Sequence, residues 1–172
     1  MPAEFLVFFF KFRFDDFLEG RADAISSEEK EGLDLFVSVG CVACHNGAGL
    51  GGGMYQKLGV TKPYPTKDTG RHQVTKKDTD KFFFKVPSLR NINQTAPYFH
   101  DGGVETLETA VNRMSVFQLG RVLSKEETDK IVAFLKSLDG DLSPEVVAIL
   151  EPEFRRKNLV RAKFGARPQT QE

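Results

Sequence analysis

Hydrophobic residues recur at helical spacing in three separate parts of the chain. The first part has Ser26 and, three residues later, Glu29, a pair that is typical of a capping box at the start of a helix. Apolar residues follow at intervals of three and four: Leu33, Phe36 and Val37. A helix is therefore expected to run from Ser26 into Gly40.

The second part repeats this pattern more strongly. Ser124 and Glu127 form another capping-box pair, and Gly140 is the expected stop. The apolar face of this helix consists of four residues: Ile131, Phe134, Leu135 and Leu138. The third part, VETLETAVNRMSVF, lies between the other two. It predicts a helix with three apolar residues on one face: Leu107, Val111 and Met114.

The periodicity fails between Gly47 and about Gly103. Glycines interrupt this stretch, and so do four prolines: Pro63, Pro65, Pro87 and Pro97. Such a long irregular segment is unusual in a compact domain, but it becomes reasonable where it wraps a large apolar cofactor that supplies part of the core. After Gly140, SPEVVAIL predicts a short helix, and the basic residues beyond it predict a solvated tail.

The charges of the chain are balanced. Lys and Arg number 24, as do Asp and Glu, so the formal net charge is zero. No overall field draws the protein to nucleic acid or anionic lipid, and any charged partner must meet a local patch. The length of 172 residues fits one compact domain with extensions. The apolar run from Phe5 to Phe10 is too short for a membrane span, and no secretory signal is visible.

The candidate chemistry lies in GCVACHNG, which contains the only two cysteines, Cys41 and Cys44, followed directly by His45. Cysteines at i and i+3 face the same side of a helical turn. Two thiols in that position can form thioethers to a porphyrin while the imidazole binds its iron, so the motif is typical of c-type haem attachment. The neighbouring GAGLGG matches a dinucleotide-binding pattern in letters only, because no strand precedes it and no helix follows.

Three other interpretations of the cysteines are weaker. A zinc site would need His72 and His100 as further ligands, and these are 28 residues apart without the spacing of a zinc finger. A redox dithiol would need a βαβ setting, which the sequence does not predict. A simple disulfide is the plainest alternative. The pattern favours haem, because the histidine follows immediately and the irregular segment needs a cofactor.

A haem iron held by His45 has a second axial position, with four candidate ligands: Met54, Met114, His72 and His100. Met54 follows His45 by only nine residues, which makes the opposite face of a porphyrin awkward to reach. Met114 lies 69 residues away, on a helix that could close over the far side. The alternative role for Met114 is core packing.

Several stretches, in order, resemble one family. They are FDDFLEG, EEKEGLDLF, GCVACHNG, DTGR, FKVPSLRNINQTAPYFHDG, MSVFQLGR and LSKEETDKIVAFLKSL. From about Phe14 to Gly140 the chain resembles the C-terminal domain of bacterial dihaem cytochrome c peroxidases. In that family the N-terminal haem reacts with peroxide, and the C-terminal His/Met haem accepts electrons from a small donor.

The resemblance implies roles for individual residues. Cys41 and Cys44 attach the haem, His45 is the proximal ligand and Met114 is the distal one. Backbone carbonyls that bind calcium in the family fall at two positions here, Thr95 and Pro97; a further calcium ligand comes from a domain that this chain lacks.

Three other residues have either two alternative roles or no direct role at the haem. Arg90 either holds a haem propionate or braces a loop. His100 is expected to support the site or fix a loop, and His72 to lie at the surface.

The expected fold is all-α, a cytochrome-c-like domain with long irregular loops around one covalent haem. We expect an N-terminal segment (1–25) that is consistent with the remnant of an interdomain linker, a cytochrome c domain (26–140) and a C-terminal extension (141–172). A truncated dihaem enzyme and a true monohaem protein both fit the sequence.

The expected function is single-electron transfer as the electron-entry domain of a peroxidase. The alternatives are a stand-alone monohaem carrier, a haem domain with its own peroxidase activity, and a metal-free or zinc-bound interaction module. The expected partners are a cytochrome c or a cupredoxin as donor, and a peroxidatic haem domain. A periplasmic location is expected, because c-type haem attachment in bacteria is completed outside the cytoplasm.

Overall fold

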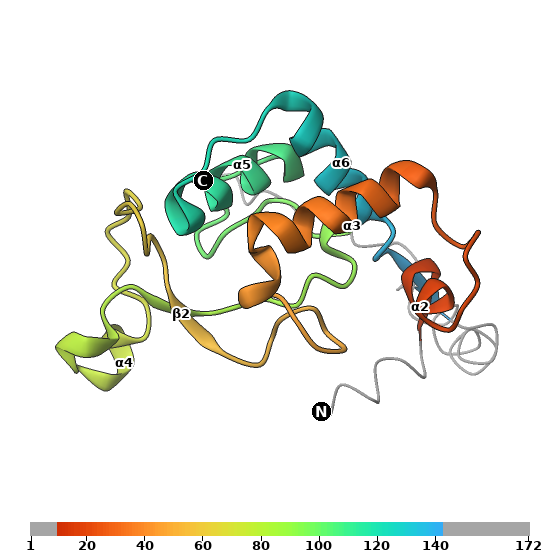
Figure 1. Ribbon diagram of the computed structural model, residues 1–172. Coiled ribbons are helices and arrows are strands. Elements are labelled where there is room, and N and C mark those ends of the chain that lie inside the picture. The colour runs from red at the N-terminus through yellow and green to blue at the C-terminus, as the bar shows by residue number, and fades with distance from the viewer. Residues whose placement is uncertain (1–9, 143–172) are drawn as a thin grey trace, which may run out of the picture.

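The computed structural model describes residues 10–142 as a mainly helical domain (Figure 1). The helices are α2 (Arg13–Leu18), α3 (Ser27–Val39), α4 (His72–Thr75), α5 (Leu107–Leu119) and α6 (Lys125–Lys136), with 3₁₀ turns at Cys41–Ala43, Asp78–Asp80 and Ile92–Gln94. The strands are β1 (Phe10–Phe12), β2 (Tyr55–Lys57), β3 (Phe83–Lys85) and β4 (Gly140–Leu142). The helix predicted at SPEVVAIL and the basic tail lie outside the described residues.

The three predicted helices are confirmed, together with both capping boxes. The hydroxyl of Ser26 accepts a hydrogen bond from the Glu29 amide, and the Glu29 carboxylate accepts one from the Ser26 amide. Ser124 and Glu127 make the same pair of bonds. α3 ends at Gly40, as predicted, in the left-handed region at φ +105°.

Two details of these helices differ from expectation. α6 ends at Lys136 rather than at Gly140, because Gly140 pairs with Phe12 in the antiparallel sheet of β1 and β4. Val37 is 51% exposed, although the spacing assigned it to the apolar face of α3. The face that α3 buries is therefore narrower than the pattern predicted.

The core lies where α3 and α6 cross. Phe134 of α6 is fully buried, and its ring lies 5.2 Å from that of Phe36 and 5.3 Å from that of Phe14, between ring centres. Gly32 of α3 packs directly on the backbone of Lys130. α5 covers the same core with Leu107. This arrangement leaves the C-terminal end of α3, and the cysteine motif after it, at one end of the core.

Residues before Ser26 also belong to this packing. Phe12, Phe14 and Ile25 are buried, and the last two join the main core. Arg13 donates two hydrogen bonds to the carboxylate of Glu29, at 2.5 and 3.0 Å. Burial alone would raise the pKa of Glu29, but the hydrogen bonds from Arg13 and from the Ser26 amide lower it below its usual value.

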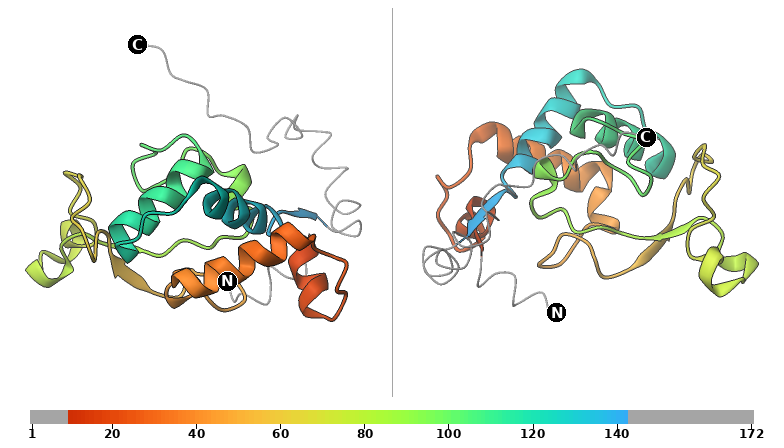
Figure 2. Two further views of the ribbon diagram at one scale, coloured as in Figure 1. Left: turned by 45° about the horizontal axis from the view of Figure 1, so that its top comes forward. Right: turned by 180° about the vertical axis from the view of Figure 1, so that it is seen from behind.

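The predicted irregular segment, 47–103, contains only short elements. The two strands β2 and β3 pair antiparallel, so the domain carries two small sheets in addition to the expected helices. Figure 2 shows this part, with α4 at its tip, extending from one end of the helical body. Gln118 of α5 anchors it by accepting from the Gly59 amide at 2.5 Å and donating to the Lys57 carbonyl at 3.0 Å.

Candidate haem-binding site

The cysteine motif forms a tight turn immediately after α3. The amides of Cys44 and His45 both donate to the Cys41 carbonyl, at 3.2 and 3.0 Å, so the turn continues as far as the histidine. Both cysteines are free thiols rather than a disulfide. Burial, with a smaller contribution from Cys44, raises the pKa of Cys41 to about 11. The Cys41 thiol is therefore protonated near neutral pH.

The two other histidines contact residues of the irregular segment. The ring of His100 stacks on Phe84 with 4.3 Å between ring centres, and its Nε2 lies 3.2 Å from the Thr66 hydroxyl. His72 opens α4, half-buried rather than fully at the surface, with Nδ1 3.4 Å from the Thr69 hydroxyl. Among residues 10–142, no three His, Cys, Asp or Glu side chains gather as a metal-binding group, so the cysteines lack the partners that a zinc site needs.

The orientation of His45 is set by backbone carbonyls. Its Nδ1 lies 3.3 Å from the Leu50 carbonyl, and the Pro87 carbonyl is a second hydrogen-bonding partner. Burial lowers the pKa of His45, and these two carbonyls only partly oppose the shift, so the ring is neutral at pH 7. A neutral imidazole that donates from Nδ1 keeps the lone pair of Nε2 for a metal. The donor set therefore fits a covalently attached haem, with two thiols and one imidazole on a single turn.

The glycine-rich stretch after the histidine explains this geometry. Gly51 has φ +124°, and a Cβ placed there would lie 2.2 Å from the Pro87 carbonyl oxygen and 3.2 Å from His45 Nδ1. The Gly52 amide donates to the Val86 carbonyl at 3.0 Å. The stretch that imitates a dinucleotide-binding motif thus brings residues 86–87 against the imidazole. Sequence reasoning missed Leu50, Gly51 and Pro87, and the glycines after Leu50 were the signal that could have found them.

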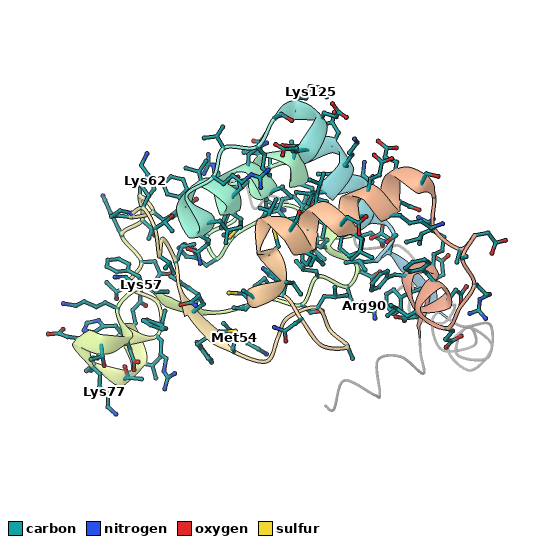
Figure 3. The ribbon with its side chains drawn as sticks, viewed as in Figure 1. Met54, Lys57, Lys62, Lys77, Arg90 and Lys125 are labelled. Carbon is teal, nitrogen blue, oxygen red and sulfur yellow. The ribbon has the colours of Figure 1, made fainter. Side chains whose placement is uncertain are left out.

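The two candidate methionines differ in their surroundings. Met114 is half-buried on α5, where Leu107 is buried and Val111 packs against the core. Met54 is 37% exposed and lies on the loop that leads into β2 (Figure 3). A thioether that binds iron must be shielded from water on one face of the cofactor. The surroundings of Met114 therefore suit that role better than those of Met54.

Arg90 connects three segments. Its Nη2 donates to Asp15 Oδ1 at 2.5 Å, its Nε donates to the Ala48 carbonyl at 3.0 Å, and its guanidinium lies 4.4 Å from the ring centre of Phe12. Of the two roles considered for Arg90, these contacts match the bracing of a loop. This loop, which holds Leu50, follows the turn at residues 41–45, here called the haem turn. Arg90 therefore supports the segment next to the haem turn.

Thr95 and Pro97 follow the 3₁₀ turn at Ile92–Gln94. The Thr95 hydroxyl donates to the Ile92 carbonyl at 3.0 Å, and the Ala96–Pro97 peptide bond is cis. A calcium site formed by the carbonyls of Thr95 and Pro97 stays a prediction. Within residues 10–142, no helix has the length and hydrophobicity needed to cross a bilayer.

Comparison with known proteins agrees with this site. The family model for cytochrome c matches residues 29–139. The chain is 53% identical over 142 residues to cytochrome c551 peroxidase of Nitrosomonas europaea, covering 81% of this chain and 42% of the relative. It is 44% identical over 136 residues to cytochrome c peroxidase Ccp of Escherichia coli, covering 76% of this chain and 29% of the relative. The chain thus spans less than half the length of these curated relatives.

A solved structure gives the same result at the level of the fold. The crystal structure of a MauG-like protein associated with microbial copper homeostasis superposes with a TM-score of 0.66 at 28% identity, covering 78% of this chain and 54% of that one. The match to the family model covers both the CxxCH turn and the helices that position it. The chain therefore belongs to the cytochrome c family, as an electron-transfer haem domain of the kind found in dihaem cytochrome c peroxidases.

Proposed function

We propose that this domain carries single electrons through one haem c with His45 and Met114 as axial ligands, and that it serves as the electron-entry domain of a peroxidase that reduces hydrogen peroxide. The observation that carries the proposal is the orientation of His45. A half-buried, neutral imidazole whose Nδ1 faces the Leu50 and Pro87 carbonyls presents Nε2 as a metal ligand. It does so on the same turn as two free thiols.

The side chains around the site have separate roles. Cys41 and Cys44 hold the cofactor covalently, and the carbonyls beside His45 fix its ring. Met114 supplies a neutral, soft thioether, which favours ferrous over ferric iron and raises the reduction potential. Bound haem supplies an iron that accepts and releases one electron at a time. A high potential suits a domain that receives electrons from a small carrier and passes them on.

The proposal extends to partners and location. The donor is a small redox protein such as a cytochrome c or a cupredoxin, and the acceptor is a peroxidatic haem domain. The protein acts in the periplasm, where c-type haem attachment is completed. Calcium bound by the carbonyls of Thr95 and Pro97 would stiffen the end of the irregular segment.

The axial ligands can be tested by spectroscopy on the haem-loaded protein. The ferric wild type should show one haem per chain and the weak near-infrared band of sulfur-to-iron ligation. Met114→Ala should abolish this band and open a coordination site to azide, whereas Met114→His should keep six ligands and lower the potential. Met54→Ala is the matched control and should keep the band. Loss of the band in Met54→Ala, with its survival in Met114→Ala, would overturn the assignment of the distal ligand.

Peroxide turnover separates the proposal from its main alternative. With both axial positions filled, the isolated chain has no free site for peroxide, so it should show little activity with hydrogen peroxide and reduced cytochrome c. Turnover in the ordinary enzyme range, roughly 1 to 1,000 per second, would make this domain a peroxidase in its own right.

A further inference from the structure

The segment 54–86, here called the basic arm, has a charge unlike that of the rest of the chain. It contains β2, α4 and β3 and extends from one end of the helical body (Figure 2). Its eight lysines and arginines are all exposed: Lys57, Lys62, Lys67, Arg71, Lys76, Lys77, Lys81 and Lys85. Its carboxylates number only three: Asp68, Asp78 and Asp80. The arm is therefore strongly positive within a chain whose formal net charge is zero.

The three carboxylates of the arm already have partners inside it. Asp80 lies 3.4 Å from Arg71, and Asp78 lies 2.9 Å from Lys81. Asp68 accepts hydrogen bonds at 2.7 Å from the Gly70 amide and from the side chain of Gln73. Within residues 10–142, the ion pairs of these carboxylates use Arg71, His72 and Lys81 of the arm and His100 from outside it as cations. The lysine charges that are left face solvent.

One face of the two-stranded sheet presents several of these charges around an exposed aromatic ring. Tyr55 pairs with Lys85, and Lys57 lies two residues along the same strand, so the three side chains share a face. Tyr55 is 49% exposed, and Arg71 lies over its ring at 5.1 Å. The opposite face is covered, because Phe84 stacks on His100. The exposed face thus has an apolar centre with cations around it.

The helical body has the opposite sign at the groove between α3 and α6. Four carboxylates line this groove: Glu31, Asp34, Glu126 and Glu127. Lys130 bridges the two helices at the same place, pairing with Glu31 at 2.9 Å and Glu126 at 2.6 Å. Figure 3 shows Lys57, Lys62 and Lys77 along the arm, away from Lys125 on α6. The molecule is therefore an electrical dipole with the arm as its positive end.

The base of the basic arm is hydrogen-bonded to the loop that follows the haem turn. The Val86 amide donates to the Met54 carbonyl at 2.9 Å, and the Val86 carbonyl accepts from the Gly52 amide at 3.0 Å. The next residue, Pro87, provides a carbonyl partner for His45. A protein docked on the exposed face would therefore lie beside the turn that holds the haem.

We propose that the exposed face around Tyr55, Lys57 and Lys85 docks the acidic face of a small electron-transfer protein. This inference rests on the proposed function and adds the chemistry of the partner. Opposite charges speed up encounter and orient the partner, while a small apolar centre with a charged rim permits rapid release. On docking, the reduced partner would lose one electron, and a haem held by Cys41, Cys44 and His45 would gain it, so the electron count balances.

The test uses one redox protein in two charge states. Native mitochondrial cytochrome c is basic, and partial succinylation turns some of its lysines into carboxylates; the modified protein is used only where its absorption spectrum matches that of the native protein. We expect the haem-loaded full chain to accept electrons from the succinylated form at least tenfold faster than from the native form at low ionic strength. Electrostatic screening should bring the two rates together at about 1 M salt.

Two double variants locate the surface. Lys57→Gln with Lys85→Gln should slow electron transfer from the succinylated protein about tenfold at low salt. Lys125→Gln with Lys136→Gln removes the same charge from α6 and should change the rate less than twofold. Carbodiimide, which joins lysines to carboxylates in contact, should couple the wild-type chain to the succinylated protein through Lys57 or Lys85, as mass spectrometry can show without any activity.

Failure of the docking site can be told apart from failure of the proposed function. If an electrode cannot reduce the haem-loaded chain reversibly, the proposed electron-transfer function is wrong. If the electrode reduces it but both double variants react alike, or native cytochrome c reacts faster, the docking site is wrong. Cross-links from α6 instead of the arm would also overturn it. Sedimentation would overturn it too if the wild-type chain forms a dimer that the Lys57→Gln, Lys85→Gln variant does not form.

Discussion

At the scale of single residues, His45, the proposed haem ligand, is oriented by main-chain atoms. Its Nδ1 faces the carbonyls of Leu50 and Pro87, which come from two different loops. The loops can approach because residue 51 has no side chain. The geometry of the haem site therefore depends on Gly51, although this glycine has no side chain that could bind the cofactor.

Replacing Gly51 by alanine should therefore damage the site. Its φ of +124° is strained for alanine, and the new Cβ would lie 2.2 Å from the Pro87 carbonyl oxygen. We expect a loss of about 1–3 kcal/mol in the free energy of unfolding and a reduced haem content, measured by thermal melting and by haem absorbance. Gly53→Ala is the control, because a Cβ at Gly53 meets nothing within 4 Å. Equal haem content and melting of the two variants would contradict this role for Gly51.

At the scale of elements, helix propensity and packing favour different residues where α3 crosses α6. Gly32 lies inside α3, where alanine would be more favourable by about 1 kcal/mol. A Cβ at this position, however, would lie 1.9 Å from the Lys130 carbonyl oxygen and 2.9 Å from the Phe134 Cβ. The glycine allows the two helices to approach, and their contact sets the position of the haem turn at the end of α3.

Gly32→Ala should consequently destabilise the domain in spite of its higher helix propensity. We expect a net loss of about 1–3 kcal/mol in urea unfolding, because the helices must move apart. Asp34→Ala, at an exposed position on the same helix, should stay within about 0.5 kcal/mol of the wild type. A stabilised Gly32→Ala variant would show that the crossing tolerates a side chain.

At the scale of the whole molecule, the described chain has two parts that differ in packing. The core around α3, α5 and α6 contains most of the buried apolar residues. The segment 47–103 contributes Leu50, Leu89 and Tyr98 to this core. Its outer part is attached to α5 by the ring of Tyr64, 5.0 Å from that of Phe117 between ring centres, and by the hydrogen bonds of Gln118. Under the proposed function, haem binding adds contacts to this segment, so we expect the cofactor to stabilise it more than the helical core.

Haem removal should therefore act unevenly on the domain. In a Cys41→Ser, Cys44→Ser variant purified without haem, amides of α3 and α6 should keep slow hydrogen exchange, while those of 47–103 should exchange rapidly. The haem-loaded wild type should protect both regions. Equal protection of 47–103 in the two proteins would mean that the segment folds without the cofactor.

The sequence by itself determined the three main helices and the haem turn. Capping boxes, a terminal glycine and the CxxCH spacing act over a few residues, so their geometry can be derived from local rules. The tertiary structure decided how Pro87 reaches His45 and how Arg90 reaches Asp15, 75 residues away. It also ended α6 early, because Phe12 pairs with Gly140, and gathered the lysines of a neutral chain at one end. Each of these features is a contact between distant segments, which no local periodicity encodes.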